Sequence, residues 1–119
     1  MFKSFGQRAK SFDSELNSLL AFYQIRQEEE VIDYLEHHQH LLFILEEGKK
    51  IIVDNFANST AYLEVVTDPE TEESQLAIYI NRQEKEVEVA LDRIEKLYDE
   101  WLGKYNAEIR SQILVRYNY

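Results

Sequence analysis

The sequence contains no cysteine, one proline and three glycines among its 119 residues. Without cysteine, disulfides, thiolate nucleophiles and cysteine metal ligands are all excluded. Because glycine and proline mark turns and irregular loops, their scarcity favours long helices, short connections and a few strands. No apolar run approaches the roughly 18 residues of a membrane-spanning helix. The three scattered glycines cannot form a glycine-rich phosphate loop. We therefore expect neither a membrane span nor a cofactor.

Negative charge is what the sequence has in excess. Its 23 acidic residues outnumber the 13 lysines and arginines, and the formal net charge is −10. A negative surface repels the phosphates of nucleic acids, so direct nucleic-acid binding by this acidic domain is disfavoured. The same charge attracts a basic protein, although solubility alone is a sufficient reason for it. The composition therefore favours a protein partner, and a basic one in particular.

The N-terminal residues 1–12 differ from the rest of the chain. They contain Lys3, Arg8 and Lys10, no acidic residue and no helical period, which predicts a flexible basic tail. No apolar segment follows these basic residues, so the pattern is not that of a secretory signal, and we expect a cytoplasmic location. Residues 13–119 are predicted to form a single domain around one hydrophobic core.

The periodicity of the apolar residues predicts the element order α-α-β-β-α-β. Helical spacing predicts a first helix from about residue 13 to 35, with a weak patch at Arg26–Glu30, and a second helix over about 39–57. The alternating segments AYLEVVT and QLAIYIN, with a turn between them, predict a β-hairpin. A third helix over about 81–102 precedes a final strand, SQILVRYNY. We predict an α+β fold with a three-stranded, mainly antiparallel sheet, its first strand in the middle, packed against the helices.

Three positions in the helices make specific predictions about packing. Gly48 lies inside the second predicted helix, where glycine costs about 1 kcal/mol relative to alanine. We therefore expect either close approach of another backbone or a break in the helix. Trp101 continues the apolar face that Leu91 and Ile94 begin on the third helix, so we assign it to the core. Gly103 follows the last periodic residue and suits the left-handed conformation beyond a helix end.

The three histidines, His37, His38 and His40, lie together in the segment YLEHHQHLLFIL. On one continuous helix His37 and His40 would be neighbours, and two such ligands with a third group could hold zinc. However, the spacing is neither H-x-x-x-H nor H-E-x-x-H, and the apolar period changes phase at this point. We therefore predict a joint between two helices without a metal. The alternative is a metal site at His37 and His40, within a small metal-dependent hydrolase that uses all three histidines.

The aromatic content points to a surface. The chain contains eight tyrosines and one tryptophan, and both residue types are enriched at binding surfaces because they join an apolar body to a polar tip. A three-stranded sheet leaves edges, and one face, that protein, charge or a partner must cover. The alternative is that these rings only cover the thin sheet. We predict self-association into a homo-oligomer and an interaction surface formed by Tyr62, Tyr79, Tyr117 and Tyr119.

Four segments of the chain resemble one family of small, acidic bacterial proteins of cyanobacterial type. They are LEVVTDPE, LAIYI, EVALDRIEKLYDEWL and the closing strand, and the match extends from about Val31 to Tyr119. The chain departs from the family pattern at Trp101-Leu102, where a tryptophan pair is more usual, and its second helix lacks a proline. The family has no assigned activity, so the resemblance implies a fold and not a reaction.

The residue patterns together predict a non-enzymatic protein-interaction module, for example an antitoxin-like or regulatory partner of a basic protein. The metal-dependent hydrolase remains the alternative, because the residue types permit it.

Overall fold

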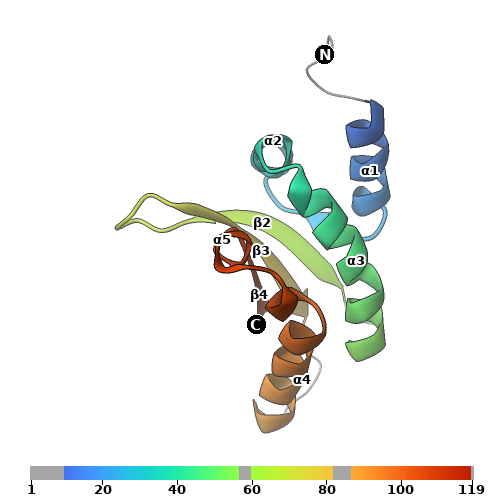
Figure 1. Ribbon diagram of the computed structural model, residues 1–119, viewed down its shortest axis with the longest axis vertical. Coiled ribbons are helices and arrows are strands. Elements are labelled where there is room, and N and C mark those ends of the chain that lie inside the picture. Colours follow the sequence, from blue (N-terminus) through green and yellow to red (C-terminus); the bar gives the residue numbers. More distant parts are fainter. Residues whose placement is uncertain (1–9, 57–59, 82–86, 119) are drawn as a thin grey trace.

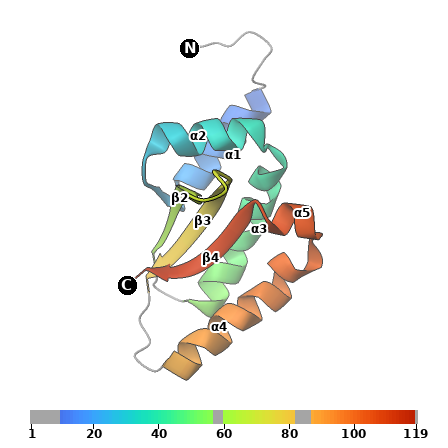
Figure 2. The same ribbon diagram turned by 90° about the vertical axis from the view of Figure 1, so that its left-hand side faces the viewer.

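The structure is a computed structural model and describes residues 10–56, 60–81 and 87–118. In these ranges four strands form one mixed sheet, and helices pack against one of its faces (Figures 1 and 2). The predicted α+β class is therefore confirmed. The elements in chain order are α1 (Lys10–Leu20), β1 (Gln24–Ile25), α2 (Glu28–His37), α3 (His40–Asn55), β2 (Ala61–Thr67), β3 (Ser74–Asn81), α4 (Val87–Glu100), the 3-10 turn η1 (Leu102–Lys104), α5 (Ala107–Arg110) and β4 (Ile113–Asn118).

The predicted first helix is in fact two helices with a short strand between them. α1 begins at Lys10, inside the predicted tail, and Phe12 is already buried. The break falls in the weak patch: Gln27 has a left-handed backbone with a φ of 53°, and α2 starts directly after it. The strand before the break, β1, pairs in parallel with β2. Two residues are too few to show the alternation that identifies a strand.

The topology of the sheet corrects the predicted three-stranded arrangement. β2 and β3 form the expected antiparallel hairpin, but β4 lies beside β3 and runs parallel to it. The strand order is β1-β2-β3-β4, so the first predicted strand is not flanked by the other two. α4 explains the parallel pairing, because its 14 residues span about 21 Å. That length returns the chain to the end of the sheet where β3 began.

Strand alternation gives the sheet two unlike faces. The face towards the helices is apolar and contains Ala61, Leu63, Leu76, Ile78, Ile80, Ile113 and Val115, all of them buried. The opposite face is not covered by any helix in the described part of the chain, as Figure 2 shows. We call it the open face; its strand residues are Tyr62, Glu64, Val66, Gln75, Ala77, Tyr79, Leu114 and Arg116.

Trp101 lies in the core, as predicted, with 0% of its surface exposed. Its ring packs against α3 at Gly48, where a Cβ atom would lie 2.8 Å from the ring atom Cε2 and closer still to its neighbours. The expected close approach at Gly48 is therefore present, but the approaching group is a side chain and not a backbone. α3 continues unbroken through this position.

The C-terminal end of α4 differs from the prediction in two details. Leu91 is 59% exposed, so the buried face of the helix is formed instead by Ala90, Leu97 and, just beyond its end, Trp101. Gly103 lies in η1 and lacks the predicted left-handed backbone. A Cβ atom there would lie 2.9 Å from the carbonyl oxygen of Tyr98, so close approach explains this glycine. No helix within the described ranges is long and apolar enough to cross a membrane.

Candidate interaction surface

Arg26 is the centre of a small polar cluster on the open face. Its backbone N–H donates to the carbonyl of Leu63 at 2.9 Å, which continues the β1–β2 pairing and directs the side chain over β2. The guanidinium carbon lies 4.5 Å from the ring centre of Tyr62 and 5.5 Å from that of Tyr79. Its Nη1 also donates to Glu64 at 3.4 Å. We call Arg26, Tyr62, Glu64 and Tyr79 the Arg26 cluster.

The sheet register brings together residues from three separate segments of the chain: β2, β3 and the residue after β1. Tyr62 and Tyr79 are directly opposite each other in the antiparallel β2–β3 pair. Tyr62 and Glu64 are two residues apart on β2, and so share a face. The side chains of Arg26 and Glu64 keep 39% and 26% of their surface exposed. Because solvent reaches both charges, the ion pair contributes at most about 1 kcal/mol, and a partner can reach the same groups.

A shallow hollow lies beside the cluster on the same face. It has a volume of ≈ 370 Å³ and is lined by Val66, Tyr79, Leu114 and Arg116, together with part of the β2–β3 loop. Arg116 is exposed and lies next to Tyr79 in the parallel β3–β4 register. Aromatic side chains and arginine with adjacent apolar area are typical of the core of a protein–protein interface.

The structure separates the four tyrosines that were predicted to form one surface. Tyr62 and Tyr79 lie together on the open face. Tyr117 lies on the helix side: its hydroxyl donates to the carbonyl of Ala90 at 2.5 Å, and its ring meets that of Phe56 edge to face. Tyr119 lies outside the described residues. Alternation offered a clue, because Tyr117 shares its face with the buried Ile113 and Val115.

Two arginines of the open face were missed by the sequence reasoning. Arg116 could have been found, because it alternates with the buried residues of β4. Arg26 could not, because it follows a two-residue strand that has no periodic signal. Only the pairing of β1 with β2 brings it over Tyr62.

The histidines occupy the predicted joint between two helices. His37 is the last residue of α2, and His38 is its C-cap. Each donates its Nδ1–H to a helix carbonyl at 2.8 Å, His37 to Asp33 and His38 to Tyr34. The His38 ring also stacks on Tyr34 with ring centres 4.0 Å apart. The position of the joint is therefore confirmed. The two rings bind carbonyl groups in the last turns of α2, at its C-terminal end.

The alternative function, a metal-dependent hydrolase, would need the histidines to converge on one metal ion. His40 contacts Gln112 through Nε2 at 2.5 Å, away from the carbonyl contacts of the other two histidines. Within the described ranges no group of three or more His, Asp or Glu side chains is arranged to hold a metal ion. The adjoining cleft, of ≈ 390 Å³, contains His38 and Tyr34 and is otherwise lined by residues of the two neighbouring loops and strand ends. No described geometry therefore favours a metal-dependent hydrolase.

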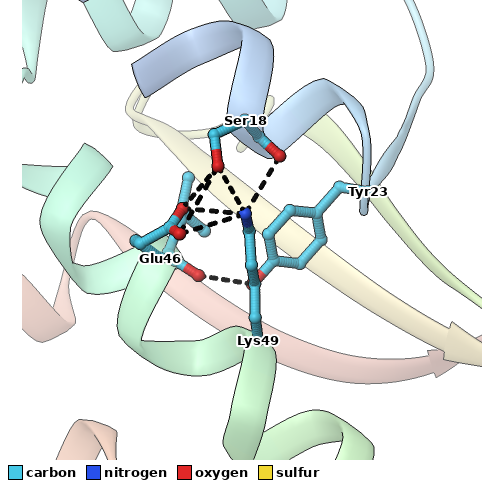
Figure 3. Close-up of polar contacts among 5 residues, drawn as sticks. Ser18, Tyr23, Glu46 and Lys49 are labelled. Carbon is cyan, nitrogen blue, oxygen red and sulfur yellow. Dashed lines mark hydrogen bonds and ion pairs between the residues drawn. The ribbon is translucent and has the colours of Figure 1, made fainter. Parts of the chain in front are cut away.

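A second polar group joins α1 to α3 and has the residue types of a nucleophilic pair (Figure 3). The ammonium Nζ of Lys49 lies 2.7 Å from the Ser18 hydroxyl and 3.0 Å from the Ser18 carbonyl. It also pairs with Glu46 at 2.9 Å. These three acceptors match the three N–H donors of a lysine ammonium. The group is a tie between two helices.

Tyr23 adds to this tie from the core side. Its hydroxyl donates to the carbonyl of Leu45 at 2.8 Å, and Figure 3 shows the ring next to Lys49. Burial, with a smaller contribution from the charge of Glu46, raises the pKa of Tyr23 far above its usual value. The phenol therefore stays protonated and acts as a donor, which anchors the end of α1 to α3.

Comparison with known proteins gives no independent assignment. No known family model matches the chain, and neither a curated protein nor a solved structure matches it.

Proposed function

We propose that this protein is a non-enzymatic, cytoplasmic interaction module that binds a basic partner protein through the open face. In this proposal the protein is an antitoxin-like or regulatory partner of that basic protein. The observation that carries the proposal is the Arg26 cluster with its adjoining hollow, on a sheet face that no described helix covers. The resemblance to small acidic bacterial proteins remains a prediction and adds no activity to it.

Charge supports a basic partner over an acidic one. The chain has a formal net charge of −10, and the loop between β2 and β3, at the rim of the open face, exposes Asp68, Glu70 and Glu73. Such a field accelerates the encounter with a positively charged protein and discourages an acidic one. The tyrosines and apolar residues of the open face would then supply the short-range contacts.

The experiment compares two surfaces of one protein. A tagged wild-type chain is used to capture a partner from its native host, and the partner is identified, purified and titrated against variants. We expect Tyr79→Ala with Leu114→Ala to weaken binding by about 2 kcal/mol or more, as for interface anchors. Phe43→Ala is the matched control, because Phe43 is 67% exposed on a helix and not on the sheet. A loss confined to Phe43→Ala, or a partner with an acidic isoelectric point, would contradict the proposal.

Self-association is a second use of the same architecture, and we propose it separately. β4 is an edge strand of the sheet, and edge strands can pair with another copy. One of its groups is already used, because the Val115 N–H donates to the Tyr98 hydroxyl at 3.0 Å. We expect a dimer at micromolar concentration in analytical sedimentation. A monomer across the accessible concentration range would refute this.

A further inference from the structure

Arg26 occupies a position on the open face that a ligand could occupy. Its guanidinium is in contact with two tyrosine rings and one carboxylate that belong to β2 and β3. Aromatic faces attract cations, and arginine in particular stacks on them while its N–H groups bind a carboxylate. The three receiving groups lie on one hairpin, whereas Arg26 follows the separate short strand β1. The receptor part of the cluster can therefore exist without Arg26.

We propose that Tyr62, Glu64 and Tyr79 form a guanidinium-binding site that Arg26 occupies intramolecularly, and that an arginine side chain of the basic partner replaces it. The inference rests on the proposed function for the nature of the partner. It adds the chemical group that is recognised and an autoinhibitory contact that recognition must displace.

The contact made by Arg26 has the properties of one that can be displaced. Its hydrogen bond to Glu64 is long, at 3.4 Å, and both side chains are partly exposed. The strand that delivers it, β1, has only two residues. The next residue, Gln27, has a left-handed φ of 53° and makes no side-chain cap to α2. A non-glycine residue is uncommon in that conformation, so the segment that carries Arg26 is joined to α2 by a turn without a side-chain cap.

The chemistry of the site selects guanidinium over other groups. Glu64 repels an anionic ligand, and the net charge of −10 does so at longer range. A lysine ammonium is more strongly hydrated and cannot stack as a plane, so it fits two ring faces less well than arginine does. A neutral side chain of the same shape lacks the positive charge that the rings and Glu64 attract, so it should bind more weakly. An exposed arginine on a basic protein is therefore the matching ligand.

The occupancy of the site by Arg26 sets the size of the effect. An intramolecular competitor reduces the apparent affinity of an external ligand by the fraction of molecules in which the site is free. If about one molecule in ten has a free site, removal of Arg26 increases affinity about tenfold, which corresponds to about 1.4 kcal/mol.

The test uses the full-length chain and a short blocked peptide with a single arginine, titrated by NMR with the amide signals of β2 and β3 as the readout. We expect Arg26→Ala to bind this peptide about tenfold more tightly than the wild type does. The double variant Arg26→Ala/Tyr62→Ala should lose that gain. Peptides with citrulline or lysine in place of arginine should bind Arg26→Ala more weakly than the arginine peptide.

Arg110→Ala is the matched control, because it removes one exposed positive charge on α5, outside both the cluster and the hollow. An equal gain in Arg110→Ala and Arg26→Ala would mean that only the general charge had changed, and would overturn the proposal. No gain in a folded Arg26→Ala would overturn it as well. If Arg26→Ala does not fold, as its NMR spectrum would show, Arg26→Gln keeps part of the aliphatic stem and is tested against the same criteria.

The two proposals fail in different ways. If the arginine peptide gives no gain while partner binding still depends on Tyr79 and Leu114, the proposed function stands and only this inference falls. If the peptide behaves as expected while partner binding does not depend on Tyr79 and Leu114, the site binds guanidinium but the partner does not use it, and the proposed function falls.

Discussion

The ring of Trp101 lies directly against the backbone of α3 at Gly48, in the space that a side chain at that position would fill. A hydrogen bond also fixes the ring, because its Nε1–H donates to the carbonyl of Ile44 at 3.0 Å. With 0% of its surface exposed, Trp101 has no room to slide away. This contact helps to hold the turn after α4 against the middle of α3.

Replacement of Gly48 by alanine is therefore expected to destabilise the protein. In an ordinary helix the change would stabilise by about 1 kcal/mol, but here the new methyl group overlaps the ring of Trp101. Overpacking of a core typically costs about 1–3 kcal/mol, and the overlap is severe, so the net free energy of unfolding should fall by about 1 kcal/mol or more. Urea unfolding measures it, with the exposed Val53→Ala on the same helix as control. A more stable Gly48→Ala would contradict the packing described.

Truncation of the tryptophan itself tests the other side of this contact. Trp101→Ala leaves a cavity and should reduce the free energy of unfolding by about 3–5 kcal/mol. Trp101→Phe removes the Nε1–H that donates to the Ile44 carbonyl but keeps much of the packed ring, so it should cost less than Trp101→Ala. Leu91→Ala, exposed on α4, should change the unfolding midpoint little. An unchanged midpoint for Trp101→Ala would show that the indole does not stabilise the core.

The parts of the fold that sequence predicts are those with a long period. α3, the β2–β3 hairpin and α4 were each recognised because apolar residues recur at one spacing over seven or more positions. β1 was missed because it has two residues, and the parallel placement of β4 was missed because strand pairing depends on contacts far apart in sequence. The exposed Leu91 shows a further limit of prediction from periodicity. The apolar spacing of a helix does not show which of its apolar residues the rest of the protein covers.

The sequence pattern places some residues of the candidate surface on the open face but not others. Tyr62 and Tyr79 alternate with buried strand residues, so their position on the open face follows from the pattern. Tyr117 alternates in step with the buried residues Ile113 and Val115, so it points to the helix side, where its hydroxyl donates to the Ala90 carbonyl of α4. Arg26 had no signal at all, because the partner that positions it, Leu63, is far away in sequence.

A pH effect is expected from the contact between α3 and the segment after α4. The hydroxyl of Tyr105 donates to Glu47 at 2.6 Å, and Lys104 donates to the other oxygen at 2.5 Å. Burial alone would raise the pKa of Glu47, but these two donors outweigh it, and the pKa is lowered. Its contribution to stability is therefore present above the unfolded pKa and is lost as the pH falls through the folded pKa. Glu47→Gln should consequently be less stable than the wild type at neutral pH.

The same variant provides the check in acid. In urea unfolding from pH 7 to pH 3, the difference between wild type and Glu47→Gln should shrink as the carboxylate is protonated in both the folded and unfolded states. A difference that stays constant over this range would mean that the charge of Glu47 contributes nothing.

Tyr105 should show the complementary effect in alkali. Burial, followed by the hydrogen bond and the charge of Glu47, raises the pKa of Tyr105 to about 12. Its contribution is present below the unfolded pKa of about 10 and is lost as the pH rises through the folded value. Ultraviolet titration should show one tyrosine ionising near pH 12 that is absent in Tyr105→Phe. An ordinary titration of that residue near pH 10 would contradict the contact.

His37 gives the last prediction, at the end of α2. Its Nδ1–H donates to the carbonyl of Asp33, and the Asp33 carboxylate is 3.6 Å away. The hydrogen bond first, and then the charges of Asp33 and Glu36, raise the pKa of His37, against a smaller opposing effect of burial. Because the folded pKa is raised, the stabilisation is fully present below the unfolded pKa and is lost as the pH rises through the folded pKa. NMR titration of the ring protons should give a higher pKa in the folded chain than in urea. Asp33→Asn should reduce the difference, because it removes the carboxylate while the backbone carbonyl remains; a His37 pKa equal in the folded and unfolded chains would contradict this geometry.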